Sequence, residues 1–145
     1  MNNFKITKEL IQKAKDKNAC QDGIKWLEKK ERTWLELKSK NIEWAVWCMT
    51  FIKDIPIDLT GLDPFNRAYV MVKRLDCPID LTGLTLFNRA YVMIKRPDCP
   101  IDLTGLSSDD RVKVMINRLD CPIDLTGLDQ DDRDYVIEKR GLKNE

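Results

Sequence analysis

The sequence repeats itself with a period of 22 residues, and this repeat restricts the possible folds more than any other feature. The heptapeptide Pro-Ile-Asp-Leu-Thr-Gly-Leu begins at Pro56, Pro78, Pro100 and Pro122. Self-similarity at a fixed period of about 20–50 residues is the signature of a repeat architecture. Each copy is therefore expected to be one structural unit that packs against its neighbours in the chain.

The segment after each heptapeptide is predicted to be a helix. Each begins with a residue whose side-chain oxygen accepts a hydrogen bond from a free N–H of the first turn: Asp63, Thr85, Ser107 and Asp129. Pro64 then occupies the first helical position, which tolerates proline. We expect helices over 64–75, 86–96, 108–119 and 130–140, joined by the heptapeptides as connectors.

Residues 41–62 are predicted to form a degenerate unit that precedes the helical units starting at 63, 85, 107 and 129. Asn41 aligns with the helix caps, and Met49 aligns with Met71. The preceding residues show no repeat. There we expect helices over 4–16 and 18–39, the second one capped by Asn18.

The chain is expected to be one domain. We expect residues 1–40 to form an N-terminal helical cap, packed on a repeat array that covers residues 41–145. All four tryptophans precede residue 48, which predicts an aromatic core in this part of the chain.

The predicted fold class is all-α: a helical cap followed by a short, solenoid-like stack of units with one helix and one connector each. A β/α coil resembling leucine-rich repeats is the alternative, with Ile-Asp-Leu as a parallel strand. That alternative would stack like charges about 4.8 Å apart, at a cost in free energy. The 22-residue repeat also lacks the Asn or Cys that the leucine-rich-repeat consensus places at a fixed spacing.

Two arginine positions recur in every unit. Counting the cap residue as position zero, position four is Arg67, Arg89, Arg111 and Arg133, and position eleven is Arg74, Arg96, Arg118 and Arg140. Positions four, seven, eight and eleven lie on one helical face, and seven and eight hold Val with Met or Ile. The arginines either form ion pairs with repeat aspartates or offer guanidinium groups to a partner.

The array is predicted to end with the last unit. Positions five and nine are apolar in three units but become Asp134 and Glu138 in the fourth. Terminal repeats have a polar outer face because no neighbour covers it.

The composition excludes several kinds of chemistry. The chain has no histidine, so Ser-His-Asp and Cys-His catalysis and His-containing zinc sites are excluded. Its five cysteines include no Cys-x-x-Cys motif, which indicates reduced thiols, and Cys77, Cys99 and Cys121 are predicted to be buried. We expect no catalytic residue, no cofactor and no metal.

Charge is distributed unevenly. Residues 1–54 hold 12 Lys and Arg against 8 Asp and Glu, whereas residues 55–145 hold 13 against 16. An acidic cluster, Asp129, Asp131 and Asp132, begins the last predicted helix, where the helix dipole favours negative charge. The candidate partner-binding residues are this cluster and the arginines Arg67, Arg89, Arg111, Arg133, Arg74, Arg96 and Arg118.

One segment resembles known proteins. The motif runs from Asn18-Ala19-Cys20 through Gly23, Trp26-Leu27 and Trp34 to Glu43-Trp44-Ala45-Val46-Trp47. It resembles a helical lead segment of small phage and bacterial proteins of unknown function. The resemblance implies a bacterial or phage-infected cytoplasm and no known active site, and small phage proteins of this kind are often inhibitors of host defence, such as anti-CRISPR proteins.

The sequence therefore predicts a non-catalytic, cytoplasmic repeat protein that binds a protein partner. A nucleic-acid-binding module that uses the arginines or the basic N-terminal helices is the alternative. No apolar run reaches the roughly 20 residues of a membrane span, and we expect no membrane partner.

Overall fold

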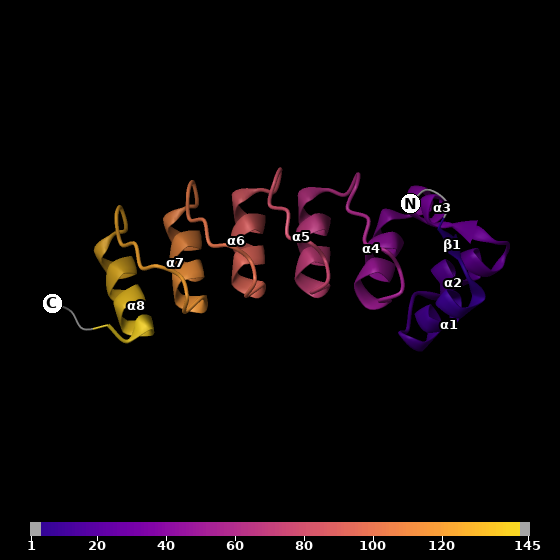
Figure 1. Cartoon of the computed structure of the whole chain (residues 1–145), viewed down its shortest axis with the longest axis horizontal. Helices are drawn as coiled ribbons and strands as arrows, with labels where there is room; N and C mark the ends of the chain where they lie inside the picture. The colour runs from indigo at the N-terminus through magenta and orange to yellow at the C-terminus, as the bar shows by residue number, and fades with distance from the viewer. Residues whose placement is uncertain (1–3, 143–145) are drawn as a thin grey trace. The chain divides into compact units, whose positions relative to one another are not determined.

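The computed structural model describes residues 4–142 and is mainly helical (Figure 1). The outermost residues of the expected cap and array, 1–3 and 143–145, lie outside this range. The described residues form eight helices and a single two-stranded sheet, so the expected all-α class is confirmed. None of these helices is long and apolar enough to cross a membrane.

The chain divides into two compact units, one up to Asn66 and one from Arg67 onward. The boundary expected at residue 40 stays a prediction.

The first unit contains four helices and the sheet. Their bounds are β1 (Lys5–Ile6), α1 (Lys8–Asp16), α2 (Gln21–Glu28), β2 (Arg32–Thr33), α3 (Trp34–Lys40) and α4 (Ile42–Phe51). The two strands are antiparallel, with Lys5 opposite Thr33. Buried Trp34 and Leu37 of α3, with Ala45 and Met49 of α4, belong to the core of this unit.

Two helices expected in the N-terminal region are interrupted. The helix expected over 4–16 begins only at Lys8, because Thr7 caps it and residues 5–6 form β1. The helix expected over 18–39 is broken, because residues 32–33 pair with β1 and Thr33 starts α3 with a capping box to Glu36.

Asn18 was expected to cap a helix, and this prediction is wrong. Asn18 has a left-handed backbone with φ 59°, and Cys20 caps α2 by accepting a hydrogen bond from the Gly23 N–H. Asn is a much commoner helix cap than Cys, whose sulfur is a weak acceptor, and the cap preferences therefore pointed to Asn18 instead of Cys20.

The repeat helices begin where the caps predict. They are α5 (Pro64–Lys73), α6 (Leu86–Lys95), α7 (Ser108–Asn117) and α8 (Gln130–Arg140). The side chains of Asp63, Thr85, Ser107 and Asp129 each accept a hydrogen bond from the N–H three residues later. Three of the four helices end one or two residues before the expected position.

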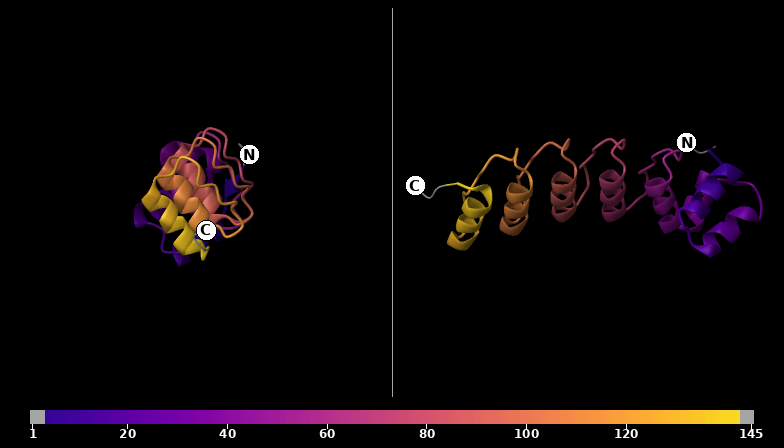
Figure 2. Two further views of the ribbon diagram at one scale, coloured as in Figure 1. Left: turned by 90° about the vertical axis from the view of Figure 1, so that its left-hand side faces the viewer. Right: turned by 90° about the horizontal axis from the view of Figure 1, so that it is seen from below.

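In the second unit, α6, α7 and α8 lie side by side with their connectors on one side (Figures 1 and 2). Its core contains the Val and Met of positions seven and eight, including Val92, Met93, Val114 and Met115, all with 0% exposure. The Ile-Asp-Leu segments do not form the strands that the β/α alternative requires. Among residues 4–142 only β1 and β2 pair as strands.

Each connector follows the same path. The Asp102 N–H donates to the sulfur of Met93 in the preceding helix, and the Asp102 carboxylate accepts from the Thr104 N–H. Gly105 then takes φ +76°, a left-handed conformation that favours glycine. After this turn the chain reaches Ser107, the N-cap residue of α7.

Candidate interaction surface of the repeat helices

Three of the four position-eleven arginines are buried, and Arg140 is half-buried. Arg74, Arg96 and Arg118 are 4%, 1% and 6% exposed. Each places its guanidinium on the aspartate two residues later; in the second repeat, Nε and Nη2 of Arg96 lie 2.8 and 2.7 Å from the carboxylate oxygens of Asp98. A bidentate pair of this kind fixes the side chain in both position and orientation.

The same guanidinium groups bind main-chain carbonyls of the preceding unit. Arg96 donates to the carbonyl oxygens of Arg74, Leu75 and Cys77 at 3.1–3.2 Å. Arg118 and Arg140 make the equivalent contacts one and two repeats later. Arg96 also donates to the carbonyl oxygen of Met71, in the last turn of α5. The last carbonyls of a helix have no partner within the helix, and here the arginine of the next repeat supplies one.

The ion pair shifts the titration of both its members. The hydrogen bond with Asp98 raises the pKa of the Arg96 guanidinium and outweighs the opposing effect of burial. The same hydrogen bond lowers the pKa of Asp98. The pair is therefore ionised throughout the neutral range.

The position-four arginines pair with the connector aspartates of the following unit. Nη2 to Oδ2 distances are 3.0 Å for Arg67–Asp80, 2.7 Å for Arg89–Asp102 and 3.0 Å for Arg111–Asp124. These arginine side chains are 16–21% exposed and their aspartates 53–57%. Such pairs lie in a well-solvated setting and contribute only about 0–1 kcal/mol each.

The first connector differs because its unit is degenerate. Ala45 and Ile52 occupy positions four and eleven there, so the arginines are missing. Asp58 is bound instead by Lys38 Nζ at 2.9 Å and by the indole N–H of Trp34 at 3.2 Å. The N-terminal helix α3 thus supplies the partner that a repeat arginine supplies elsewhere.

Arg133, the position-four arginine of the last repeat, faces no connector aspartate among residues 4–142. Arg133 is exposed and donates through Nε to the Leu128 carbonyl at 3.0 Å. Asp129 caps α8 by accepting from the Asp132 N–H, and Asp131 is exposed. The structure therefore brings the acidic cluster together at the start of α8, whereas the candidate arginines are distributed along the repeats.

A row of exposed side chains follows the C-terminal ends of the repeat helices. Leu75 and Leu119 are 73% and 79% exposed, and Pro97 occupies the same position between them. Asp76, Asp98 and Asp120 follow directly, with side chains 60–63% exposed. We call these six residues the Leu-Asp row.

The Leu-Asp row is held rigidly. The carbonyls of Leu75, Pro97 and Leu119 accept hydrogen bonds from the arginine of the next unit, at 2.9–3.2 Å. Exposed apolar side chains on fixed turns are typical of interaction surfaces. The sequence prediction did not include the leucines, although Leu75 and Leu119 both stand between the arginine and the aspartate of their repeats.

Comparison of the chain with known protein families, with curated proteins and with solved structures gave no match. Residues 4–142 contain no group of three or more Cys, Asp and Glu placed to hold a metal ion.

Proposed function

We propose that this chain is a non-catalytic helical-repeat protein that binds a protein partner through the Leu-Asp row. The observation that carries the proposal is the exposure of Leu75 and Leu119 on turns whose carbonyls are bound by Arg96 and Arg140. Rigid apolar side chains bind at low entropic cost because little conformational freedom is lost on association. The repeat carboxylates are spread along the units, whereas catalytic groups converge in one pocket.

The finer architecture belongs to the same proposal. Helices α5–α8 are four units of a solenoid-like stack, and the N-terminal helices form its cap. The 22-residue spacing of equivalent hydrogen bonds, from Arg96 to Arg74 and from Arg118 to Arg96, supports this description. In a stack each repeat contacts only its neighbours, which leaves a long regular surface for a partner.

The chemistry of the row indicates a partner with both basic and apolar groups. The Asp98 and Asp120 side chains stay 60% and 62% exposed while they accept hydrogen bonds from their covered arginines. Residues 55–145 carry a net charge of −3. A cationic partner segment with aliphatic side chains complements both features, and charge complementarity increases the rate of association.

The nucleic-acid alternative has weaker support. Three of the arginines proposed to bind phosphate are buried, and three others face aspartates. In the N-terminal helices, Lys13 and Lys15 form ion pairs with Asp54 and Glu28. Phosphate binding needs cations free to replace counterions, so these contacts oppose it.

Site-specific photo-crosslinking in the native host tests the proposal. A photoreactive phenylalanine at Leu119 is expected to capture a protein band that resists nuclease treatment and disappears in the Asp98→Lys, Asp120→Lys variant. The same group at Lys113, an exposed position of α7 in the same repeat, is the matched control. Equal capture from both positions, or a product removed by nuclease, would contradict the proposal.

The cellular setting is a further part of the proposal. The five cysteines are free thiols, which supports a reducing cytoplasm. The resemblance of the lead segment to small phage proteins suggests a partner from a bacterial defence system. Co-expression with a CRISPR interference assay tests this role, and restored plasmid maintenance that is lost in Leu119→Asp is the expected result.

A further inference from the structure

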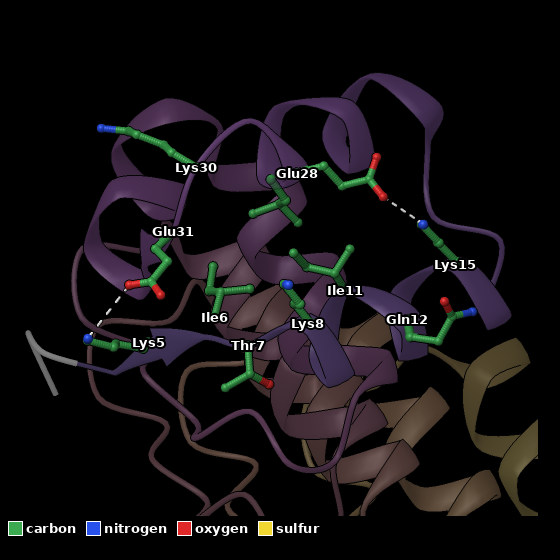
Figure 3. Close-up of a pocket in the computed structure, with 11 residues that line it drawn as sticks. Lys5, Ile6, Thr7, Lys8, Ile11, Gln12, Lys15, Glu28, Lys30 and Glu31 are labelled. Atoms are coloured by element: carbon green, nitrogen blue, oxygen red, sulfur yellow. Dashed lines mark ion pairs between the residues drawn. The ribbon is translucent and has the colours of Figure 1, made fainter.

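The first unit contains a hollow that the proposed function does not use. Its volume is about 760 Å³, and it lies between β1, α1 and the end of α2 (Figure 3). Pockets of roughly 300–1,000 Å³ are typical of small-molecule sites. All of its lining residues lie between Lys5 and Glu31, so the site is complete within the first unit.

The lining combines apolar side chains with charged ones. Ile6, Ile11 and Leu27 supply the apolar part; Ile6 and Leu27 are only 7% and 6% exposed. In Figure 3, Ile6 and Ile11 lie between two ion pairs, one at each side of the hollow. A ligand with an apolar body thus finds a preformed apolar area with a polar border.

The lining of the hollow contains more lysines than carboxylates. The two carboxylates of the lining are already paired: Glu31 with Lys5 at 3.8 Å and Glu28 with Lys15 at 2.6 Å. The ammonium group of Lys30 lies 3.3 Å from Glu36, outside the lining. Both carboxylates of the lining are therefore occupied, and one lysine of the lining remains without an ion pair among residues 4–142.

That lysine is Lys8. Figure 3 places it between the two ion pairs, beside Ile11, and the described residues give it no ion pair. Lys8 is the first residue of α1, where the helix dipole disfavours a cation. An anion at this point would therefore meet an uncompensated positive charge next to an apolar area.

We propose that the hollow binds a small monocarboxylate with an aliphatic body. The aliphatic part packs mainly on half-buried Ile11 and on the small exposed parts of Ile6 and Leu27, and the carboxylate pairs with the Lys8 ammonium. A cationic amphiphile would meet Lys8 with like charge, and a neutral one would leave it without a counter-ion. The carboxylate is therefore the preferred head group.

Titration of the isotope-labelled full chain with octanoate, followed by NMR at neutral pH, tests the site. Chemical-shift changes are expected to centre on the residues that line the hollow. Octanol and octylammonium are expected to bind about fivefold more weakly or worse, because an exposed charge pair contributes up to about 1 kcal/mol. Lys8→Gln is expected to weaken octanoate binding by a similar factor and to leave octanol unaffected.

Lys25→Gln is the matched control, since it removes the same charge from an exposed position of α2 outside the lining. It is expected to leave octanoate binding unchanged. The proposal is overturned if octanoate shifts no resonances of the hollow, if octanol binds as well as octanoate, or if Lys25→Gln weakens binding as much as Lys8→Gln.

Discussion

Nη1 of Arg96 donates a hydrogen bond to the main-chain carbonyl oxygen of Arg74, one full repeat earlier, across 3.1 Å. Arg118 makes the same bond to Arg96 at 2.9 Å, and Arg140 makes it to Arg118 at 3.2 Å. These position-eleven arginines thus link consecutive units through both side chain and main chain. The invariance of arginine at this position follows, since lysine has no planar fork to bind several carbonyls at once.

The first prediction concerns acid stability. Burial alone would raise the pKa of Asp58, but hydrogen bonds from Thr60 and Lys38 outweigh it and hold the pKa at about 2. Because the folded pKa is depressed below its usual 3.8, Asp58 stabilises the fold above pH 4. This contribution, roughly 2 kcal/mol, is expected to disappear between about pH 4 and pH 2.

Acid unfolding monitored by tryptophan fluorescence measures this effect, since the Trp34 indole is bonded to Asp58. Asp58→Asn is expected to be less stable at pH 7 and to lose less free energy of unfolding on acidification. Asp102→Asn, at the equivalent but more exposed position, is the control and is expected to change little. Identical pH dependence in Asp58→Asn and the parent would count against this role.

The second prediction concerns thiol reactivity. Burial raises the pKa of Cys48 to about 12 and also raises the pKa of Cys77, Cys99 and Cys121. Cys20 is exposed. Since the thiolate is the reactive form, Cys20 is expected to react with N-ethylmaleimide at pH 7.5 more than about tenfold faster than the others.

Mass spectrometry of timed reactions counts the labels, with Cys20→Ser as the control that lacks a fast thiol. One rapid label per native chain and five after unfolding is the expected result. Rapid labelling of the three repeat cysteines would show that the connectors are open in solution.

The third prediction concerns the end of the array. Ala90 and Val112 occupy position five and are buried, whereas Asp134 and Glu138 on α8 are exposed. Asp134→Val with Glu138→Ile restores the apolar pattern on an exposed face of α8. The variant is expected to self-associate on a sizing column, because an uncapped repeat exposes a surface that its neighbours would bury.

The control adds two apolar residues to another face of α8, as Asp132→Val with Lys139→Ile, which lie seven residues apart. This variant is expected to elute with the parent. If both variants associate equally, general hydrophobicity rather than the loss of the terminal cap explains the result.

The sequence predicted the repeat helices well because their signals are local. Thr85, Ser107 and Asp129 cap their helices through a hydrogen bond three residues away, so the cap and the helix start are set within one turn. The N-terminal helices were predicted less well. There, pairing of Lys5 with Thr33 interrupts the expected helix, and such a contact leaves no local pattern in the sequence.

The different roles of the position-four and position-eleven arginines could not be predicted from the sequence. Arg89 and Arg96 lie on one helical face beside Val92 and Met93, so helical periodicity assigns them the same environment. The difference arises from the neighbouring units. Arg96 reaches back to the carbonyls of the preceding unit, whereas Arg89 reaches forward to the solvated Asp102. Only the packed arrangement distinguishes the two.

Urea unfolding of Arg96→Ala and Arg89→Ala tests most directly the claim that buried arginines hold the repeats together. Both changes remove one guanidinium from the same repeat, but Arg96 is 1% exposed and binds several carbonyls together with Asp98. Arg96→Ala is expected to lower the free energy of unfolding by about 3–5 kcal/mol, because it leaves buried polar groups unpaired. Arg89→Ala is expected to lower it by about 0–1 kcal/mol. Equal losses, or wild-type stability of Arg96→Ala combined with salt-sensitive binding of nucleic acid by the parent, would contradict the account.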